Sequence, residues 1–428
     1  MTDGRWARFR VDIEPWRRYP DFRLLLTAQG ITALGSSITM VAAPLQVARM
    51  TGSFWLTGLL GAAEFLPNVV CGLWGGAIAD AHDRRRVVLL AEAALLVLSA
   101  VLLFNALLPS PQVWLIFVVA AGIAGAGAIQ RPSNDALIPR VVRHDDLAAA
   151  SALEGLVGNG AFIIAPALGG LLASASMPLA YTLDVASFVA SLTLLVRLAP
   201  APPTDPSARP DLGAVVAGLR YAVSRRDLLG CYAVDISAMA LAMPEALFPF
   251  LAGELHRPGA LGLLYSAGSV GSAIAAATSG WTSRVHRHGW AIILAAMGWG
   301  VAMAIAGVMP SLWLILLFLA LAGAADMISG VFRSTLWNQT IPDELRGRLA
   351  GIELLGYTSG PTLGNARAGA VAAFGGTRLA IWSGGLLCMA AVGAVATALP
   401  SFRRYDARTD PYALARRDAE VHPTVQKP

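Results

Sequence analysis

The chain has 428 residues, of which 56% are hydrophobic and only 14% are charged. Soluble globular domains carry about 25% charged residues, so this composition excludes an ordinary soluble domain and a disordered chain alike. The same low fraction of charged residues excludes a nucleic-acid-binding protein, whose basic surface needs many more charges. Three cysteines, Cys71, Cys231 and Cys388, lie far apart in apolar stretches, which leaves neither a disulfide framework nor a metal site.

Twelve apolar stretches are long enough to cross a bilayer, because a hydrocarbon core of about 30 Å needs roughly 20 helical residues. Each stretch is bounded by charged residues or by clusters of Pro and Gly. The predicted spans are residues 22–48, 54–79, 87–107, 112–136, 147–173, 179–199, 228–253, 260–283, 289–309, 312–337, 347–373 and 378–399. We therefore expect an all-α integral membrane protein with 12 transmembrane helices.

Basic residues predict the orientation of these spans. Of the 32 Lys and Arg residues, 28 lie in the two termini or in the connections that follow even-numbered spans. Only Arg49, Arg257 and Arg378 lie on the other side, and Arg367 lies within a span. Since cytoplasmic segments carry the excess of basic residues, both termini are predicted to be cytoplasmic. The first twenty residues lack the apolar region of a cleavable signal peptide.

A Pro-rich segment at residues 199–211 separates two groups of six spans, and an amphipathic stretch follows it. The predicted organisation is a cytoplasmic arm at 1–21, a six-helix half at 22–199, a cytoplasmic linker with an amphipathic helix at 200–227, a second six-helix half at 228–399 and a cytoplasmic tail at 400–428. The halves resemble each other: Gly-Leu-Leu at 58–60 recurs at 262–264, and Ile-Pro at 138–139 recurs at 341–342. Parallel repeats of six spans are typical of one class of secondary transporter.

The loop after the second span carries a family resemblance. Residues 76–86, GAIADAHDRRR, resemble the signature loop of the major facilitator superfamily, although Ala81 and Asp83 depart from its usual residues. The runs ALIP at 136–139, APALGG at 165–170 and LFP at 247–249 are similar to the branch that contains enterobactin and related siderophore and drug exporters. This resemblance covers nearly the whole chain and implies the major facilitator fold, with the substrate between the two halves.

The resemblance assigns a gating role to the loop. Gly76 has no side chain and would let another helix pack closely, while Asp80 would latch the halves together with Arg84 and Arg85. The alternative for the arginines is that they set the topology and contact anionic lipid.

A second gating motif is expected in the fifth span. Pro166, Gly169 and Gly170 resemble the antiporter motif of exporters, in which Pro bends the helix and Gly lets it seal against a neighbour. The alternative is a generic helix kink, because such kinks occur in transporters of either direction.

Acidic residues inside the spans are the candidates for proton coupling, because a charge in the bilayer is costly unless it faces a cavity or a partner. They are Glu64, Asp235, Glu245, Asp326 and Glu353. The alternative for each is a structural charge pair, and Asp326 and Arg333, seven residues apart, share one helix face. Asp184, at the start of the sixth span, is expected to be structural.

Four further residues are candidates for substrate binding. Arg367 suits an anionic substrate or one of the acids, and the rings of Tyr265, Phe162 and Tyr357 could stack on a catechol or a flat drug. Aromatic residues of membrane helices also serve as interfacial anchors or packing groups.

These patterns indicate a secondary active exporter of the bacterial inner membrane, driven by protons and without a cofactor. The expected cargo is a siderophore or similar amphipathic small molecule, and the expected oligomeric state is a monomer. A multidrug or macrolide efflux pump of the same superfamily is the alternative, and a non-transporting receptor or scaffold is the alternative from another class. No enzyme is indicated, because the sequence has no nucleotide-binding loop, no HExxH motif and no Cys/His cluster.

Overall fold

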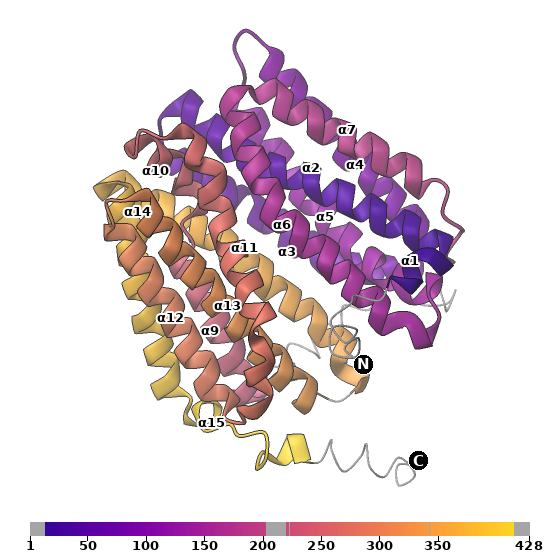
Figure 1. Ribbon diagram of the computed structural model, residues 1–428, viewed down its shortest axis with the longest axis vertical. Helices are drawn as coiled ribbons and strands as arrows, with labels where there is room; N and C mark the ends of the chain where they lie inside the picture. The colour runs from indigo at the N-terminus through magenta and orange to yellow at the C-terminus, as the bar shows by residue number, and fades with distance from the viewer. Residues whose placement is uncertain (1–12, 203–219, 222, 342, 415–428) are drawn as a thin grey trace, which may run out of the picture. The chain divides into compact units, whose positions relative to one another are not determined.

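The structure is a computed structural model that describes residues 13–202, 220–221, 223–341 and 343–414, without the side chains of Ala77, Asp80, Asn159, Pro258 and residues 343–358. Within these ranges the regular secondary structure is helical throughout and contains no strand (Figure 1). The chain divides into two compact units. Unit 1 comprises Met1–Gln46 and Val70–Pro210, and unit 2 comprises Val47–Val69 and Asp211–Pro428. Most of the predicted linker, 203–219 and 222, lies outside the described residues.

Long helices make up unit 1, and two of them, α2 and α3, continue into the segment that belongs to unit 2. The elements are α1 (Glu14–Arg18), α2 (Pro20–Thr51), α3 (Phe54–Ala81), α4 (Arg84–Leu107), α5 (Val113–Val141), the short 3-10 helix η2 (His144–Asp146), α6 (Leu147–Ala175) and α7 (Met177–Leu195). One hydrophobic cluster joins α2, α4, α5, α6 and α7, with Phe22, Leu25 and Leu137 almost completely buried.

Unit 2 has shorter and more interrupted helices. Its elements are α9 (Arg226–Ala242), η3 (Glu245–Leu247), α10 (Phe248–Glu254), η4 (Pro258–Ala260), α11 (Leu261–Ala277), η5 (Ser279–Arg284), α12 (His288–Val308), α13 (Leu312–Thr340), α14 (Asp343–Ala398) and α15 (Pro400–Arg403). α9 packs on α14, and α13 packs on both α11 and α12.

Ten helices of the described residues are long and apolar enough to cross a membrane, which confirms a multi-pass all-α protein. Two predicted regions differ in form. The stretch 260–283 contains α11, of 17 residues, followed by η5. The stretches 347–373 and 378–399 both lie in α14, where the backbone leaves the helical conformation at Gly376, with φ 81°. Glycine tolerates this positive φ because it has no Cβ, so α14 consists of two helices that meet at Gly376.

The predicted span at 228–253 is one of these ten, Arg226–Glu254, but its helix breaks in the middle. α9 ends at Ala242, Met243 is extended (φ −72°, ψ 117°), and the chain resumes as η3 and then α10. Pro244 explains the break: proline has no N–H for a helical hydrogen bond and pushes the preceding residue out of the helical region. Pro249 fits the first turn of α10, where no such bond is needed.

The packing inside the two units supports the internal repeat. In unit 1, α4 packs against α5 and α7, and in unit 2, α12 packs against α13 and α14. The α12–α14 contact involves the part of α14 beyond Gly376, since a Cβ on Gly307 would meet Trp382 and one on Gly300 would meet Met389. The third, fourth and sixth segments of the first half therefore pack like their counterparts in the second.

Glycine makes the closest helix contact of unit 2 possible. A Cβ on Gly271 of α11 would overlap the carbonyl oxygen of Ala320 in α13, and one on Gly323 would overlap the carbonyl of Gly268. The Ser272 hydroxyl donates to the Gly323 carbonyl oxygen at 2.8 Å across the same contact. Small residues that let helix backbones approach are the usual means of packing helices in membranes.

We expect Gly271→Val to lower the free energy of unfolding by about 1–3 kcal/mol, the usual cost of forcing extra methyl groups into a packed interior. Thermal unfolding in detergent measures this loss. Gly268→Ala is the matched control, because its Cβ would lie 3.9 Å from the nearest atom, the Leu319 carbonyl oxygen. Equal losses in the two variants would contradict the packing described here.

Candidate functional site

The break between α9 and α10 places polar backbone in the middle of an apolar helix pair. The N–H of Ala246 donates to the Asn365 side-chain oxygen at 2.9 Å, and the Tyr265 hydroxyl donates to the Glu245 carbonyl oxygen at 3.0 Å. These two side chains satisfy backbone groups that the break leaves without helical partners, as a membrane interior requires. Asn365 was missed by sequence reasoning, although a lone amide in an apolar span is a recognisable signal.

Two acidic side chains lie within electrostatic range of each other at this break. The carboxyl group of Glu64, from α3, interacts electrostatically with that of Glu245, and the Tyr265 hydroxyl interacts with both. Both acids are half-buried, whereas Tyr265 is only 6% exposed and its ring packs edge-on against Phe248 with centroids 5.0 Å apart. Three of the predicted site residues thus lie together in unit 2, and no basic side chain contacts them in the described part of the chain.

A close helix contact lies beside this acidic pair. A Cβ on Gly58 of α3 would lie 2.7 Å from the Cα of Gly369 in α14, and one on Gly61 would lie 2.7 Å from the Thr362 carbonyl oxygen. We call this contact the α3–α14 seam. Glu64 follows Gly61 by one helical turn, so Glu64 and the glycines of the seam lie on one stretch of α3.

The predicted acids Asp235 and Asp326 occupy a different place, around Arg333 of α13. Arg333 donates to Asp235 of α9 in a close ion pair, and its second nitrogen lies 3.7 Å from the Asp326 carboxylate. The Arg333 and Asp235 side chains are 15% and 14% exposed. The placement of Asp326 and Arg333 on one helix face is confirmed. The arrangement of these three side chains fits a structural charge pair with a second acid beside it. A structural charge pair is the alternative that the sequence left open for each acid.

The remaining substrate and coupling candidates are Arg367, Phe162, Glu353 and Tyr357. Arg367 donates to the Ala380 carbonyl oxygen at 2.9 Å, and its Nε and Nη1 are buried without a hydrogen-bond partner. Phe162 is 49% exposed and belongs to unit 1. The side chains of Glu353 and Tyr357 lie outside the described residues. No described group of three or more His, Cys, Asp or Glu is arranged to hold a metal ion.

Comparisons with known proteins agree on one family. A major facilitator family described as "transmembrane secretion effector" matches residues 13–422. The chain belongs to the major facilitator superfamily. An enterobactin exporter of Citrobacter koseri is 32% identical over 367 residues, which are 83% of this chain and 86% of the relative. An enterobactin exporter of Shigella boydii serotype 4 is 31% identical over 382 residues, 87% of this chain and 89% of the relative.

A solved structure shows the same fold. It is a bacterial homologue of the iron transporter ferroportin, with a TM-score of 0.65 at 16% identity, covering 90% of this chain and 98% of that chain. The superfamily consists of membrane transporters rather than enzymes, so the prediction that the protein is not an enzyme is confirmed.

The superfamily loop after α3 forms side-chain hydrogen bonds to backbone carbonyl groups of unit 1. The Arg84 side chain donates to the Ala79 and Ala136 carbonyl oxygens, both at 3.3 Å, and Arg85 donates to the Val196 carbonyl oxygen. These carbonyls lie at the C-terminal ends of α3, α5 and α7, where a cation complements the helix dipole. Within unit 1 the arginines therefore cap helices.

The glycine and the aspartate of this motif, Gly76 and Asp80, give a different result. No described atom lies within 4 Å of a Cβ placed on Gly76, whereas a Cβ on Gly75 would lie 2.7 Å from the Ala128 carbonyl oxygen. A close approach to α5 therefore occurs at Gly75, and the packing role expected for Gly76 stays a prediction. The Asp80 side chain lies outside the described residues, so its latch role stays a prediction.

The second gating motif of the superfamily lies at a helix contact in unit 1. A Cβ on Gly169 of α6 would lie 2.9 Å from the Cα of Ile38 in α2, so only glycine permits this approach. Pro166 lies inside α6, one turn earlier, and Gly170 is buried. The motif thus brings α6 against α2, as the resemblance implies, while its role in gating stays a prediction.

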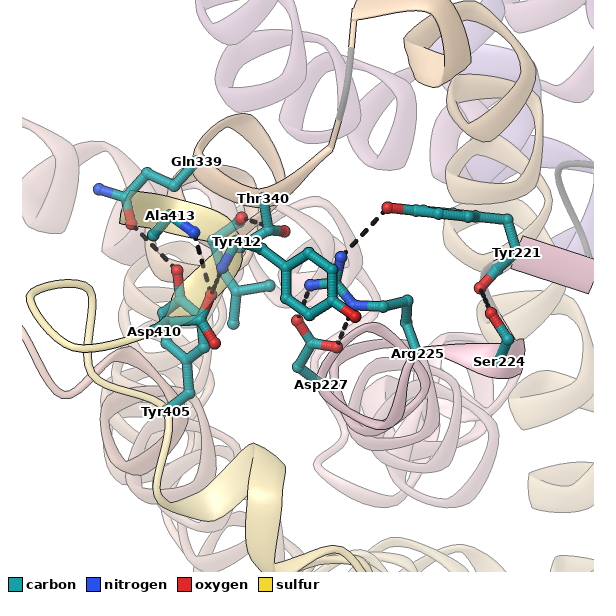
Figure 2. Close-up of polar contacts among 11 residues, drawn as sticks. Tyr221, Ser224, Arg225, Asp227, Gln339, Thr340, Tyr405, Asp410, Tyr412 and Ala413 are labelled. Carbon is teal, nitrogen blue, oxygen red and sulfur yellow. Dashed lines mark hydrogen bonds and ion pairs between the residues drawn. The ribbon is translucent and has the colours of Figure 1, made fainter. Parts of the chain in front are cut away.

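The start of α9 is fastened by a cluster that sequence reasoning missed (Figure 2). Arg225 makes a bidentate ion pair with Asp227, and its Nη1 donates to the Tyr221 hydroxyl at 3.1 Å. The Tyr412 ring, from the C-terminal segment, covers the guanidinium at 3.3 Å from its centroid. Tyr405 is 4% exposed and donates to Gln339 at 3.4 Å. The C-terminal segment is therefore packed onto unit 2.

Charge and burial act in opposite directions on this cluster. Burial disfavours the Arg225 guanidinium, but the Asp227 carboxylate and Tyr221 outweigh it and raise the pKa of Arg225. Burial, together with Asp410 and Asp227, raises the pKa of Tyr405. Arg225 therefore stays charged at every physiological pH.

We expect Arg333→Met to destabilise the protein by about 3–5 kcal/mol, because it strands the buried Asp235 carboxylate without its cation. The double variant Asp235→Asn with Arg333→Met should be more stable than the single one, since it removes the stranded charge. Unfolding free energies of the four members of this mutant cycle measure the coupling. Arg404→Met, at an exposed site, is the control, and strictly additive losses would contradict the ion pair.

Proposed function

We propose that the protein is a secondary active exporter of the bacterial cytoplasmic membrane, which moves a siderophore or a similar amphipathic small molecule out of the cytoplasm by alternating access. The observation that carries the proposal is the broken α9–α10 segment with Glu245 facing Glu64. Discontinuous membrane helices are where secondary transporters bind substrates and coupling ions. The enterobactin exporters that match most of the chain support the cargo class.

In this proposal the chain crosses the membrane twelve times, with both termini in the cytoplasm. Ten long apolar helices are available, and the division of α14 at Gly376 adds one crossing. α11 with η5 supplies the twelfth. The excess of Lys and Arg in the termini and in the connections after even-numbered spans supports the orientation.

Proton coupling follows from the repulsion between Glu64 and Glu245. Two interacting carboxylates in a region of low dielectric constant are unfavourable when both are ionised, and one bound proton removes the repulsion. No cation of the described residues replaces that proton, because Arg333 is engaged with Asp235 and Arg367 contacts the Ala380 carbonyl. The driving force in this proposal is the proton gradient, acting on a monomer without a cofactor.

A proton bound by the Glu64–Glu245 pair would change the packing at the α3–α14 seam. Gly58 and Gly61 pack against α14 on the same stretch of α3 that carries Glu64. Repulsion between Glu64 and Glu245 pushes α3 away from the α9–α10 break, and protonation relieves it. Protonation would therefore favour the packed seam, and loss of the proton would favour its opening, which is the coupling that an antiporter needs.

We expect Glu64→Gln and Glu245→Gln to abolish the acceleration of export by an imposed pH gradient. Allosteric couplings of about 1–3 kcal/mol correspond to changes of about 5–150-fold, so gradient-driven transport should fall by at least about fivefold. Substrate exchange without a gradient should persist, because Gln keeps the shape of the site. Transport in proteoliposomes with an imposed pH gradient measures both rates.

Glu254→Gln is the control for these variants, because Glu254 is an exposed acid 3.5 Å from Arg378 and far along α10 from the break. It should retain the full response to the gradient. An unchanged pH profile in both Glu64→Gln and Glu245→Gln would remove the pair from proton coupling.

A multidrug or macrolide efflux pump is the second candidate, and the acidic lining of the break favours it. Two carboxyl groups beside Tyr265 and Phe248 would attract an amphipathic cation. We expect the reconstituted protein to transport a catecholate siderophore faster than a lipophilic cationic drug. The reverse order would favour the drug pump, and transport of neither would favour a receptor or scaffold.

A further inference from the structure

Unit 1 contains two carboxyl groups that neither the gating motifs nor the proposed transport site uses. Asp184 of α7 and Glu92 of α4 are each only 1% exposed, and both lie inside apolar helices long enough to cross a membrane. Acidic side chains in such a place carry a cost unless they are neutral or paired. Their environment in the structure decides which of these two solutions applies.

Neutral donors surround Asp184. The hydroxyl groups of Thr39 and Ser99 both donate to its Oδ2, at 2.6 and 2.8 Å. Its Oδ1 is buried and has no hydrogen-bond partner. A Cβ on Gly35 would lie 2.7 Å from this oxygen, so the backbone of α2 closes over it. One oxygen of the carboxyl group is therefore saturated with donors and the other has none.

Glu92 differs because both of its oxygens are occupied. The Thr32 hydroxyl donates to Oε1 at 2.5 Å, and the Gln130 amide donates to Oε2. Thr32 and Thr39 lie seven residues apart on α2, so the two carboxyl groups are separated by about 10 Å along that helix. They still interact electrostatically, and the interaction opposes two negative charges.

The titratable groups around Asp184 offer no positive charge. From the described helices packed against it, Glu92 of α4 and Tyr181 of α7 interact with it, and Tyr181 donates to Gln46 of α2 at 2.7 Å. The titratable groups Arg131, Asp135 and Glu154 of α5 and α6 interact among themselves instead. No basic side chain contacts Asp184 or Glu92 in the part of the chain that the structure describes.

We propose that Asp184 is a proton-binding site of unit 1, distinct from the Glu64–Glu245 pair, and that it holds a proton at neutral pH. An ionised Asp184 would leave Oδ1 buried, negatively charged and without a donor, next to a second acid. The neutral form keeps Oδ2 as a carbonyl oxygen that accepts from Thr39 and Ser99.

Infrared spectroscopy of the full chain in nanodiscs tests this proposal, because the carbonyl stretch of a protonated carboxyl group is separate from the bands of carboxylates. We expect a carboxylic-acid band at pH 7 that shifts in D2O and is lost in Asp184→Asn. The band should remain in Asp145→Asn, the matched control at an exposed site of η2. A band at pH 7 that is unchanged in Asp184→Asn would overturn the proposal.

A second variant keeps the test informative if Asp184→Asn does not fold. Thr39→Val removes one hydrogen-bond donor to the Asp184 carbonyl oxygen but keeps the carboxyl group. A carbonyl with fewer hydrogen bonds absorbs at higher frequency, so the band should remain and move upward. An unmoved band in a folded Thr39→Val protein would overturn the assignment to Asp184.

Exchanging the buffer salt distinguishes a bound proton from a bound metal cation. A bound proton predicts the same band when sodium is replaced by choline at constant pH and ionic strength. A carboxylate band in sodium that becomes an acid band in choline would assign the site to Na⁺ and overturn the proton. Failure of gradient-driven transport in Glu64→Gln leaves this result untouched, because the Asp184 band does not depend on transport.

Discussion

A bilayer core offers no water to a polar group, and this constraint decides where the chain can interrupt a helix and where it can keep a charge. The interruption between α9 and α10 exists because Asn365 accepts the Ala246 N–H and Tyr265 donates to the Glu245 carbonyl. Without these two side chains, the backbone that Pro244 disrupts would remain unsatisfied. The residues that repair the break also surround Glu245, so the same contacts that stabilise the fold create the candidate site.

Charges inside the helices follow two different solutions. Arg333 pairs with Asp235 and lies beside Asp326, between α9 and α13, so one cation serves two carboxylates and its loss would strand a charge. Glu64 and Glu245 have no such cation, and neither have Glu92 and Asp184 in unit 1, among the described residues. An adjacent cation favours the ionised form of a carboxyl group. The proposed coupling role therefore falls on the pair that lacks one, Glu64 and Glu245.

Close helix packing at glycine positions joins the helices that carry these groups. Glycine brings α3 against α14 at Gly58 and Gly369, and brings α11 against α13 at Gly271. Contacts of this kind are either packed or open, because the backbone atoms leave no intermediate space. The cluster of Arg225, Asp227 and Tyr412 fixes the start of α9 (Figure 2). In the proposed mechanism, a change of charge at the break acts on a segment whose first helix is held at its start.

The sequence by itself determined the helices, the internal repeat and the family, because apolar length and motif residues are local properties of the chain. It also pointed to several of the acids inside these helices, although Glu92 of α4 was missed. Only the tertiary structure decided their partners, since these come from helices far apart in the sequence. Asp235 and Glu245 share one predicted span, yet one faces Arg333 and the other faces Glu64. Spacing along a helix specifies a direction, and the neighbour found in that direction depends on how the helices pack.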